Sequence, residues 1–368
     1  MYNFGLSEKP FDLSFALNML RGRMDFTVGA LDSSSTLDFY REVENRTIVE
    51  QVFDLDAPSK KRLIAALERA AGPGESDYNY RFFADNCATR PAALLRLTAG
   101  EDSPPFAAYP SKTIRSSVDE VLGKRAWLRL AVDCLLGPRA DRRIPMGPIF
   151  LPEDLMKWAA RATIGSVHGA HALVSETRVL YEAKPEPRRP LLPSPLEVSL
   201  AILAIAILAS AFQSRAARAA RVFDLVLFCF AVLPFISILV FRFSARYEEV
   251  GGNLNLLWAT PVPLAALALS RGGPRRATPR ALFALAALAA AAISAGGGYG
   301  WQSVPAEVRL LAAAVALRCA FRPGLLDAHR EDCAPDQSGP IVVPVKDESS
   351  SMERKLARSR PAAQITVK

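Results

Sequence analysis

One cysteine of this 368-residue chain lies where a thiol can act as a nucleophile. Cys87 follows an aromatic segment, residues 78–83, whose side chains favour a strand, and the turn-forming pair at 85–86. Apolar residues at helical spacing continue over 92–97, and Gly100 ends the run. The order of these features predicts a strand, a turn, Cys87 and the first turn of a helix.

The predicted position of Cys87 gives its thiol a chemical use. The positive end of a helix dipole favours a thiolate, which is the reactive form of cysteine. A small cysteine that is simply buried in the core is the alternative, and the pattern leaves both interpretations open. If Cys87 is the nucleophile, its neighbours Tyr80, Asn86, Thr89 and Arg90 are the candidates for supporting it.

Composition excludes several other classes of site. The five cysteines are widely spaced and none belongs to a CxxC pair, so no metal site and no cofactor is predicted. A disulfide between Cys87 and Cys134 remains open. The net charge of +8 comes partly from short arginine clusters beside apolar runs, which indicates membrane topology and no nucleic-acid partner. The sequence does not indicate an oligomeric state.

The N-terminal half has the composition of a globular domain with mixed secondary structure. Ser59 is expected to cap a helix that Gly72 ends. The other expected elements are strands or short irregular segments over 10–30, an extended segment over 36–55, a helix over 59–71, a Pro- and Ser-rich loop over 101–118, and helices over 127–136 and 153–162.

The C-terminal half is dominated by apolar runs rich in Ala and Leu. A membrane span needs about 20 apolar residues. Five spans are predicted, at about 195–213, 222–241, 254–270, 281–298 and 304–321. The sequence therefore predicts a domain over 1–181, a Pro-rich linker over 182–194, a five-helix transmembrane domain over 195–322, and a disordered cytoplasmic tail over 323–368.

Several separate motifs give the chain a likeness to one family. They are Tyr2-Asn3-Phe4-Gly5, Arg21-Gly22-Arg23, Tyr40-Arg41, Arg46-Thr47, Gln51, the segment 80–90, Gly137, Ala140-Asp141-Arg142, Phe150-Leu151-Pro152, and the segment 253–258 with Pro261. In this order they resemble the Lnb-type bacterial membrane proteins. The resemblance implies an α+β permuted papain-like (NlpC-like) periplasmic domain followed by a bundle of about five transmembrane helices in the inner membrane.

The resemblance also implies a reaction. An acyl chain passes from a membrane phospholipid, through a thioester on Cys87, to the amino terminus of a lipoprotein, so phospholipid and lipoproteins are the expected partners. Backbone amides at the helix start would stabilise the oxyanion. Asn253, Asn255 and Trp258, at the expected outer end of the third span, either meet lipid headgroups or form a lipid entry to the site.

One part of the family pattern is not matched in this sequence. The family's histidine belongs to a Gly-His segment ahead of the stretch that starts at Tyr2, whereas the histidines here are His168, His171 and His329. We therefore expect that the true start lies upstream, or that this is a truncated or degenerate copy, inactive as written. A non-catalytic lipid- or partner-binding membrane protein and a cell-wall peptidase or amidase with the same thiol remain the alternative functions.

The arginine-rich loops predict the membrane orientation. Basic residues follow the first, third and fifth spans, and the positive-inside rule places them in the cytoplasm. Reporter fusions after Arg221, Arg280 and Arg322 should therefore report the cytoplasm, and fusions near Val250 and Gly298 the exterior. A uniform cytoplasmic signal from all five fusions would contradict the five-span topology.

Overall fold

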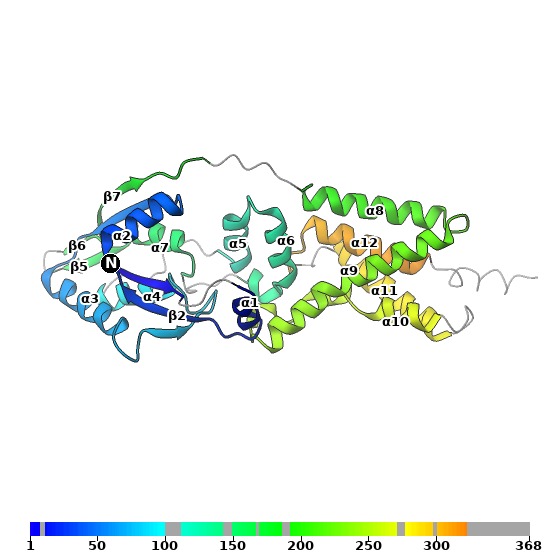
Figure 1. Cartoon of the computed structure of the whole chain (residues 1–368), viewed down its shortest axis with the longest axis horizontal. Helices are drawn as coiled ribbons and strands as arrows, with labels where there is room; N and C mark the ends of the chain where they lie inside the picture. The colour runs from blue at the N-terminus through cyan, green and yellow to red at the C-terminus, as the bar shows by residue number, and fades with distance from the viewer. Residues whose placement is uncertain are drawn as a thin grey trace, which may run out of the picture. The chain divides into compact units, whose positions relative to one another are not determined.

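The computed structural model describes residues 1–7, 12–99, 112–142, 149–166, 169–185, 192–270, 277–296 and 300–321. Along the chain, a part that mixes strands and helices is followed by a part that is helical (Figure 1). The expected tail over 323–368 and residues 186–191 of the expected linker lie outside these ranges.

The strands of the N-terminal part form small antiparallel sheets. One sheet has the order β1-β2-β4, and Phe26 of β2 lies opposite Tyr78 of β4. A second sheet pairs β3 with β7, and a third pairs β5 with β6. The bounds are β1 Tyr2–Leu6, β2 Asp25–Ala30, β3 Ile48–Phe53, β4 Asp77–Asn79, β5 Thr163–Ser166, β6 Gly169–Ala172 and β7 Val174–Tyr181.

Three of the helices in this part begin at aspartate caps. The carboxylates of Asp12, Asp32 and Asp56 each accept an N–H from the first turn that follows, as favoured N-cap residues do. The bounds are α1 Leu13–Leu20, α2 Ser33–Asp38, η1 Phe39–Val43, α3 Ala57–Ala70, α4 Thr89–Ala99, α5 Ile114–Leu122, α6 Ala126–Leu135, η3 Pro138–Asp141 and α7 Pro152–Ala159.

The structure confirms three predicted helices and corrects other parts of the prediction. The helices expected over 59–71, 127–136 and 153–162 are α3, α6 and α7, although Asp56 caps α3 instead of Ser59. In the segment expected over 10–30, helix α1 precedes the strand β2. In the segment expected over 36–55, the end of α2 and η1 precede the strand β3. Residues 114–118 of the expected loop belong to α5, because Thr113 and Ser116 cap that helix reciprocally.

The helical part follows the predicted spans with shorter and broken elements. In the described ranges, α9 and α11 are the helices long and apolar enough to cross a membrane, while α8 and the segment 254–269 are apolar but shorter. Prolines at 261 and 263 divide the third predicted span into η5 and α10. The bounds are α8 Pro195–Ala211, α9 Ala217–Phe243, η4 Glu248–Val250, η5 Leu254–Leu257, α10 Val262–Leu269, α11 Ala277–Gly296 and α12 Ala306–Ala320.

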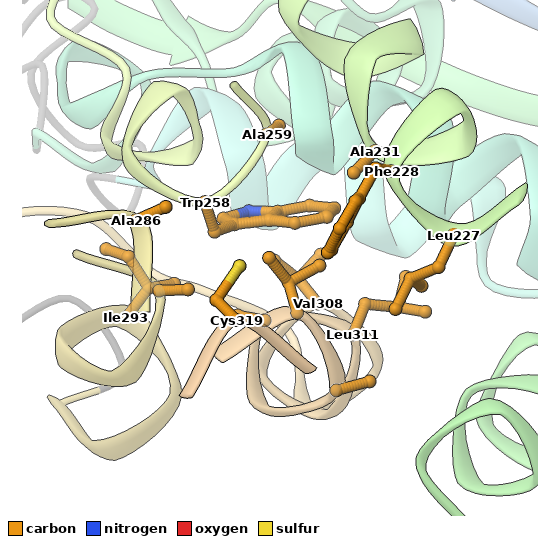
Figure 2. Close-up of a cluster of buried hydrophobic side chains, with 14 of the residues drawn as sticks. Leu227, Phe228, Ala231, Trp258, Ala259, Ala286, Ile293, Val308, Leu311 and Cys319 are labelled. Atoms are coloured by element: carbon orange, nitrogen blue, oxygen red, sulfur yellow. The ribbon is translucent and has the colours of Figure 1, made fainter. Parts of the chain in front are cut away.

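The largest hydrophobic core lies among these helices and surrounds Trp258. Figure 2 shows the indole among side chains that include Phe228, Val308 and Cys319. Leu130 and Cys134 of α6 belong to the same core, although α6 precedes the apolar half of the sequence. The structural core is therefore shared between the two halves of the chain.

A buried ion pair also connects the helices of this part. Arg318 of α12 donates to both carboxylate oxygens of Asp224 on α9, at 2.6 and 3.1 Å, and both side chains are almost fully buried. The guanidinium also donates to Ser210 Oγ and Gln213 Oε1 near the end of α8. Because a buried charge is tolerated only when it is paired and hydrogen-bonded, this cluster fixes the relative positions of three helices.

Arg115 of α5 is the polar centre of the region around α6. Its guanidinium donates to the carboxylates of Asp133 (3.0 Å) and Asp141 (2.8 and 3.1 Å). It also donates to the carbonyl oxygens of Asp133 and Leu136 at the end of α6. Arg115 thus joins α5, α6 and η3 through one side chain.

Replacing Arg115 should strongly destabilise the protein. In Arg115→Met the two carboxylates lose their buried cation, which typically costs about 3–5 kcal/mol. Thermal unfolding of the protein in detergent measures the effect, with Arg125→Met as the matched control because Arg125 is exposed. Equal unfolding temperatures for the two variants would contradict a central role for Arg115.

Candidate functional site

Cys87 lies in the turn between β4 and α4, two residues before the first helical residue, Thr89. This confirms the predicted placement of the thiol just ahead of a helix. The expected aromatic strand is shorter than predicted, because β4 ends at Asn79 and the chain then turns through a bridge between Arg81 and Asp85. The side chain of Cys87 is partly exposed and unpaired with another cysteine.

Asn86 holds this turn in place. Its side-chain oxygen accepts the N–H groups of Ala88 (2.8 Å) and Thr89 (2.9 Å). Its amide nitrogen donates to the carbonyl oxygens of Phe82 (2.7 Å) and Phe150 (2.8 Å). The side chain is 2% exposed and fully engaged, so Asn86 fixes the backbone on both sides of the thiol.

These bonds change the expected source of oxyanion stabilisation. The amides of Ala88 and Thr89 are committed to Asn86 and do not point freely at a substrate. The N–H of Cys87 itself donates to no acceptor in the described part of the chain. The free donor at the head of α4 is therefore the amide of the cysteine, immediately beside its own sulfur.

Tyr80 is the polar side chain that meets the thiol. Its hydroxyl oxygen lies 3.9 Å from Cys87 Sγ, and its ring packs on Phe26 with centroids 4.6 Å apart. Burial, and next the proximity of Cys87, raise the pKa of Tyr80 well above its ordinary value. Because the hydroxyl keeps its proton at neutral pH, Tyr80 can donate a hydrogen bond to a thiolate or an oxyanion but cannot be the general base.

Arg90 and Thr89 brace the turn without touching the thiol. Arg90 forms a bidentate ion pair with Asp85 at 2.6 and 3.0 Å, and its guanidinium lies 3.7 Å from the centre of the Tyr78 ring. Thr89 Oγ1 accepts the backbone N–H of Asn86 at 2.7 Å. Both residues act on Cys87 through the conformation of the turn.

The first strand also passes the thiol, which the sequence did not reveal. A Cβ atom built on Gly5 would lie 3.6 Å from Cys87 Cβ, so β1 runs against the cysteine. Tyr78 donates a hydrogen bond to the carbonyl of Phe4, which ties β1 to the aromatic cluster. Pairing of residues far apart in sequence carries no local signal, so only the motif at 2–5 pointed to this strand.

The structure describes His171 and leaves His168 and His329 outside its ranges. His171 lies on β6, where its Nε2 is 3.1 Å from the carbonyl oxygen of Asp54 and 3.6 Å from a carboxylate oxygen of the same residue. No contact in the described part joins His171 to Cys87 or Tyr80. His171 therefore does not complete the site in this conformation.

An apolar cavity of about 710 Å³ lies between β3, α3, α4 and α7. Leu67 and Leu94 line it and also pack against the cluster around Tyr78, where Cys87 packs as well. Cys87 itself is not among the lining residues. The cavity and the thiol are thus neighbours separated by these leucine side chains.

Asn253, Asn255 and Trp258 are not at the surface where the sequence predicted a headgroup contact or lipid entry. They are 3%, 0% and 1% exposed. The two asparagine amides donate to the carbonyl oxygens of Cys134 and Leu135 at 2.9–3.0 Å, and Trp258 Nε1 donates to Asn255 Oδ1. These three residues connect η5 to the end of α6.

Gln302 completes this connection and was not predicted. Its amide donates to the carbonyl of Leu136 (3.2 Å) and to Asn253 Oδ1 (3.0 Å), and its oxygen accepts the N–H of Leu254 (2.8 Å). It is 2% exposed. A lone glutamine beside an apolar run has no recognisable spacing, so its role appears only when the chain is folded.

Cys134 makes no disulfide with Cys87, because both are free thiols. Burial raises the pKa of Cys134 to about 12. At pH 7 this leaves on the order of one Cys134 in 10⁵ as thiolate. Among the described residues, no group of His, Cys, Asp and Glu side chains is arranged to hold a metal ion.

Alkylation should therefore distinguish the cysteines. A water-soluble, membrane-impermeant alkylating agent near pH 7 should label Cys87 before buried Cys134 and Cys319, since Cys87 alone among the cysteines in the described ranges is partly exposed outside the apolar helices. Peptide mapping by mass spectrometry measures the order. Labelling of Cys87 no faster than Cys134 would identify it as a structural thiol.

The comparisons with known proteins match both parts of the chain. The family model described as the Lnb N-terminal periplasmic domain matches residues 8–120, and that described as the Lnb transmembrane domain matches residues 187–326. No curated protein and no solved structure matches the chain. The two matches occur in the order that the sequence motifs predicted. The chain therefore belongs to the Lnb-type membrane proteins, with a periplasmic N-terminal domain followed by a transmembrane domain.

Proposed function

We propose that the protein is a cysteine-dependent acyltransferase of the inner membrane that moves an acyl chain from phospholipid to the amino terminus of a lipoprotein. One observation carries the proposal: a partly exposed thiol at the head of α4, 3.9 Å from the hydroxyl of Tyr80, in the periplasmic domain of a membrane protein. Lipid substrates remain in the bilayer, so an anchored thiol domain suits them.

In the first step the thiolate of Cys87 attacks the ester carbonyl carbon of a phospholipid. A C–S bond forms and the ester C–O bond breaks, and the leaving lysophospholipid oxygen takes the proton that the base removed from the thiol. The N–H of Cys87 and the hydroxyl of Tyr80 are the nearest donors for the oxyanion.

In the second step the α-amine of the lipoprotein attacks the thioester. A C–N bond forms, the C–S bond breaks, and the proton lost by the amine returns through the base to Cys87. The thiol is regenerated and no cofactor is consumed. A thioester preserves the reactivity of the acyl group while lysophospholipid leaves and the lipoprotein enters.

The proton transfers need an imidazole near Cys87. Tyr80 cannot serve, because its raised pKa keeps it protonated. The resemblance assigns the base to a Gly-His segment ahead of Tyr2, and this strand arrangement is the permuted papain-like fold that we propose for the domain. β1, which such a segment would lead into, passes beside Cys87 at Gly5.

A competing function is favoured by one observation. The described histidine, His171, contacts Asp54 and not the thiol. A protein of this fold without an imidazole at Cys87 would bind lipid or a partner without catalysis. The assay below separates this function from acyl transfer.

Substitution of Cys87 should abolish acyl transfer. The assay is complementation of a strain whose own lipoprotein N-acylation is blocked, with the lipoprotein amino terminus determined by mass spectrometry. We expect a chain that carries the Gly-His segment ahead of Tyr2 to transfer the acyl group, and its Cys87→Ser variant to transfer none. Replacement of the histidine in that segment by alanine should slow transfer by about 10²–10⁴-fold, as expected for loss of a general base.

Cys229→Ser is the matched control, because Cys229 is an exposed cysteine on α9 and should be dispensable. An exported, folded chain with the Gly-His segment that transfers no acyl group would refute the acyltransferase function and leave the binding function. Full activity of the Cys87→Ser variant would show that Cys87 is not the nucleophile.

A further inference from the structure

Helix α1 is rich in apolar residues, yet none of them is fully buried. Its sequence, LSFALNML, contains six apolar residues out of eight, and no residue of α1 is buried. Leu13 is 75% exposed and Leu17 is 44% exposed. A surface helix of a soluble domain normally packs its apolar stripe against the core, so this helix is adapted to a different apolar environment.

The end of α1 lies at the end of transmembrane-domain helix α9. The turn after α1 contains Gly22, at φ +68°, and a Cβ atom at this glycine would lie 2.9 Å from the Cα and carbonyl oxygen of Ala245. Ala245 follows α9 by two residues, and Phe243, the last residue of α9, is 71% exposed. The C-terminal end of α1 therefore lies beside the end of a helix that is long enough to cross the membrane and that ends in an exposed apolar residue.

Basic side chains flank this position. Arg21 and Arg23, on either side of Gly22, are both exposed. An apolar helix with arginines beside it is the pattern of helices that lie in the membrane interface, where apolar side chains enter the acyl region and cations meet lipid phosphates.

Aromatic contacts connect α1 to the thiol. Phe15 of α1 packs edge-on against Phe26, with ring centroids 6.3 Å apart, and Phe26 packs on Tyr80 at 4.6 Å. The hydroxyl of Tyr80 in turn lies 3.9 Å from Cys87 Sγ. The helix and the thiol are thus held in one packed unit.

We propose that α1 is a membrane-surface helix whose exposed leucines insert into the periplasmic leaflet of the phospholipid bilayer beside the end of α9. Leu13 and Leu17 lie among the acyl chains, and Arg21 and Arg23 contact headgroup phosphates. Through Phe15, Phe26 and Tyr80, this insertion holds Cys87 at the level of the lipid surface. This last step rests on the proposed acyl transfer, whereas the insertion itself does not.

Photocrosslinking tests the insertion independently of activity. The full chain, in bilayers of phosphatidylethanolamine and phosphatidylglycerol, carries p-benzoylphenylalanine at position 13 or 17. Position 225 on α9 is the positive control, and exposed positions 64 on α3 and 179 on β7 are matched apolar controls in the thiol domain. Phospholipid adducts are measured by mass spectrometry. We expect adducts at 13 and 17 within about threefold of position 225, and at least about tenfold above positions 64 and 179.

Adduct yields at 13 and 17 as low as those at 64 and 179, with position 225 labelled, would overturn the insertion. A second measurement tests the link to Cys87. In the chain that carries the Gly-His segment, the double variant Leu13→Asp, Leu17→Asp should transfer acyl chains from vesicles at least about tenfold more slowly than its parent, because carboxylates resist entry into the acyl region. Its Cys87 should be alkylated at an unchanged rate, which shows that the domain is folded.

An unchanged rate of transfer in this double variant would refute the role of α1 in presenting Cys87 to lipid. If the parent chain, extended by the Gly-His segment and without the two aspartates, transfers no acyl group, the acyltransferase function is refuted instead. The crosslinking result is valid in either case, so the two failures are distinguishable.

Discussion

The carbonyl groups at the end of α6 are the point on which the arrangement of this protein depends. A helix leaves its last carbonyls without intrahelical partners, and buried ones must be satisfied elsewhere. Here Arg115 bonds the carbonyls of Asp133 and Leu136 from the thiol-domain side, and Asn253, Asn255 and Gln302 bond those of residues 134–136 from the transmembrane side. Losing either set leaves buried polar groups unpaired, so the helix end holds both halves of the chain together.

Other close contacts around this helix end belong to the same connection. Gly137 lies against the backbone of Gly251: a Cβ atom on Gly137 would be 2.5 Å from the carbonyl oxygen of Gly251. The N–H of Gly137 donates to the carbonyl oxygen of Glu249. Asp141 accepts from Arg115 and from the N–H of Ser303. Arg129 of α6 pairs with Glu307 of α12. Backbone approach and polar bonds thus supplement the apolar core that Leu130 and Cys134 share with the membrane helices.

The site around Cys87 differs from the end of α6, because one backbone donor, the N–H of Cys87, has no acceptor in the described part of the chain. Asn86 accepts the N–H groups of Ala88 and Thr89, and the ion pair between Arg90 and Asp85 braces the turn. The cysteine amide and the Tyr80 hydroxyl remain beside the sulfur. Such a site is rigid because its surroundings are saturated with hydrogen bonds, and rigid placement of donors is what stabilises a developing oxyanion.

The sequence by itself determined the elements whose signals are local. The sequence predicted the position of Cys87 ahead of a helix, the helices α3, α6 and α7, the apolar runs and the family motifs. Capping, periodicity and composition act over a few residues, so these features could be predicted locally. The Asp12 cap outweighed the aromatic alternation at α1, and η1 continues directly from α2, which Asp32 caps, so neither helical element was predicted from the sequence. Only the tertiary structure decided that Gly5 passes Cys87, that Asn253, Asn255 and Trp258 are buried connectors, and that Gln302 joins them. Apart from the local bond between Trp258 and Asn255, these contacts link residues tens to more than a hundred positions apart, so no short stretch of sequence carries their signal.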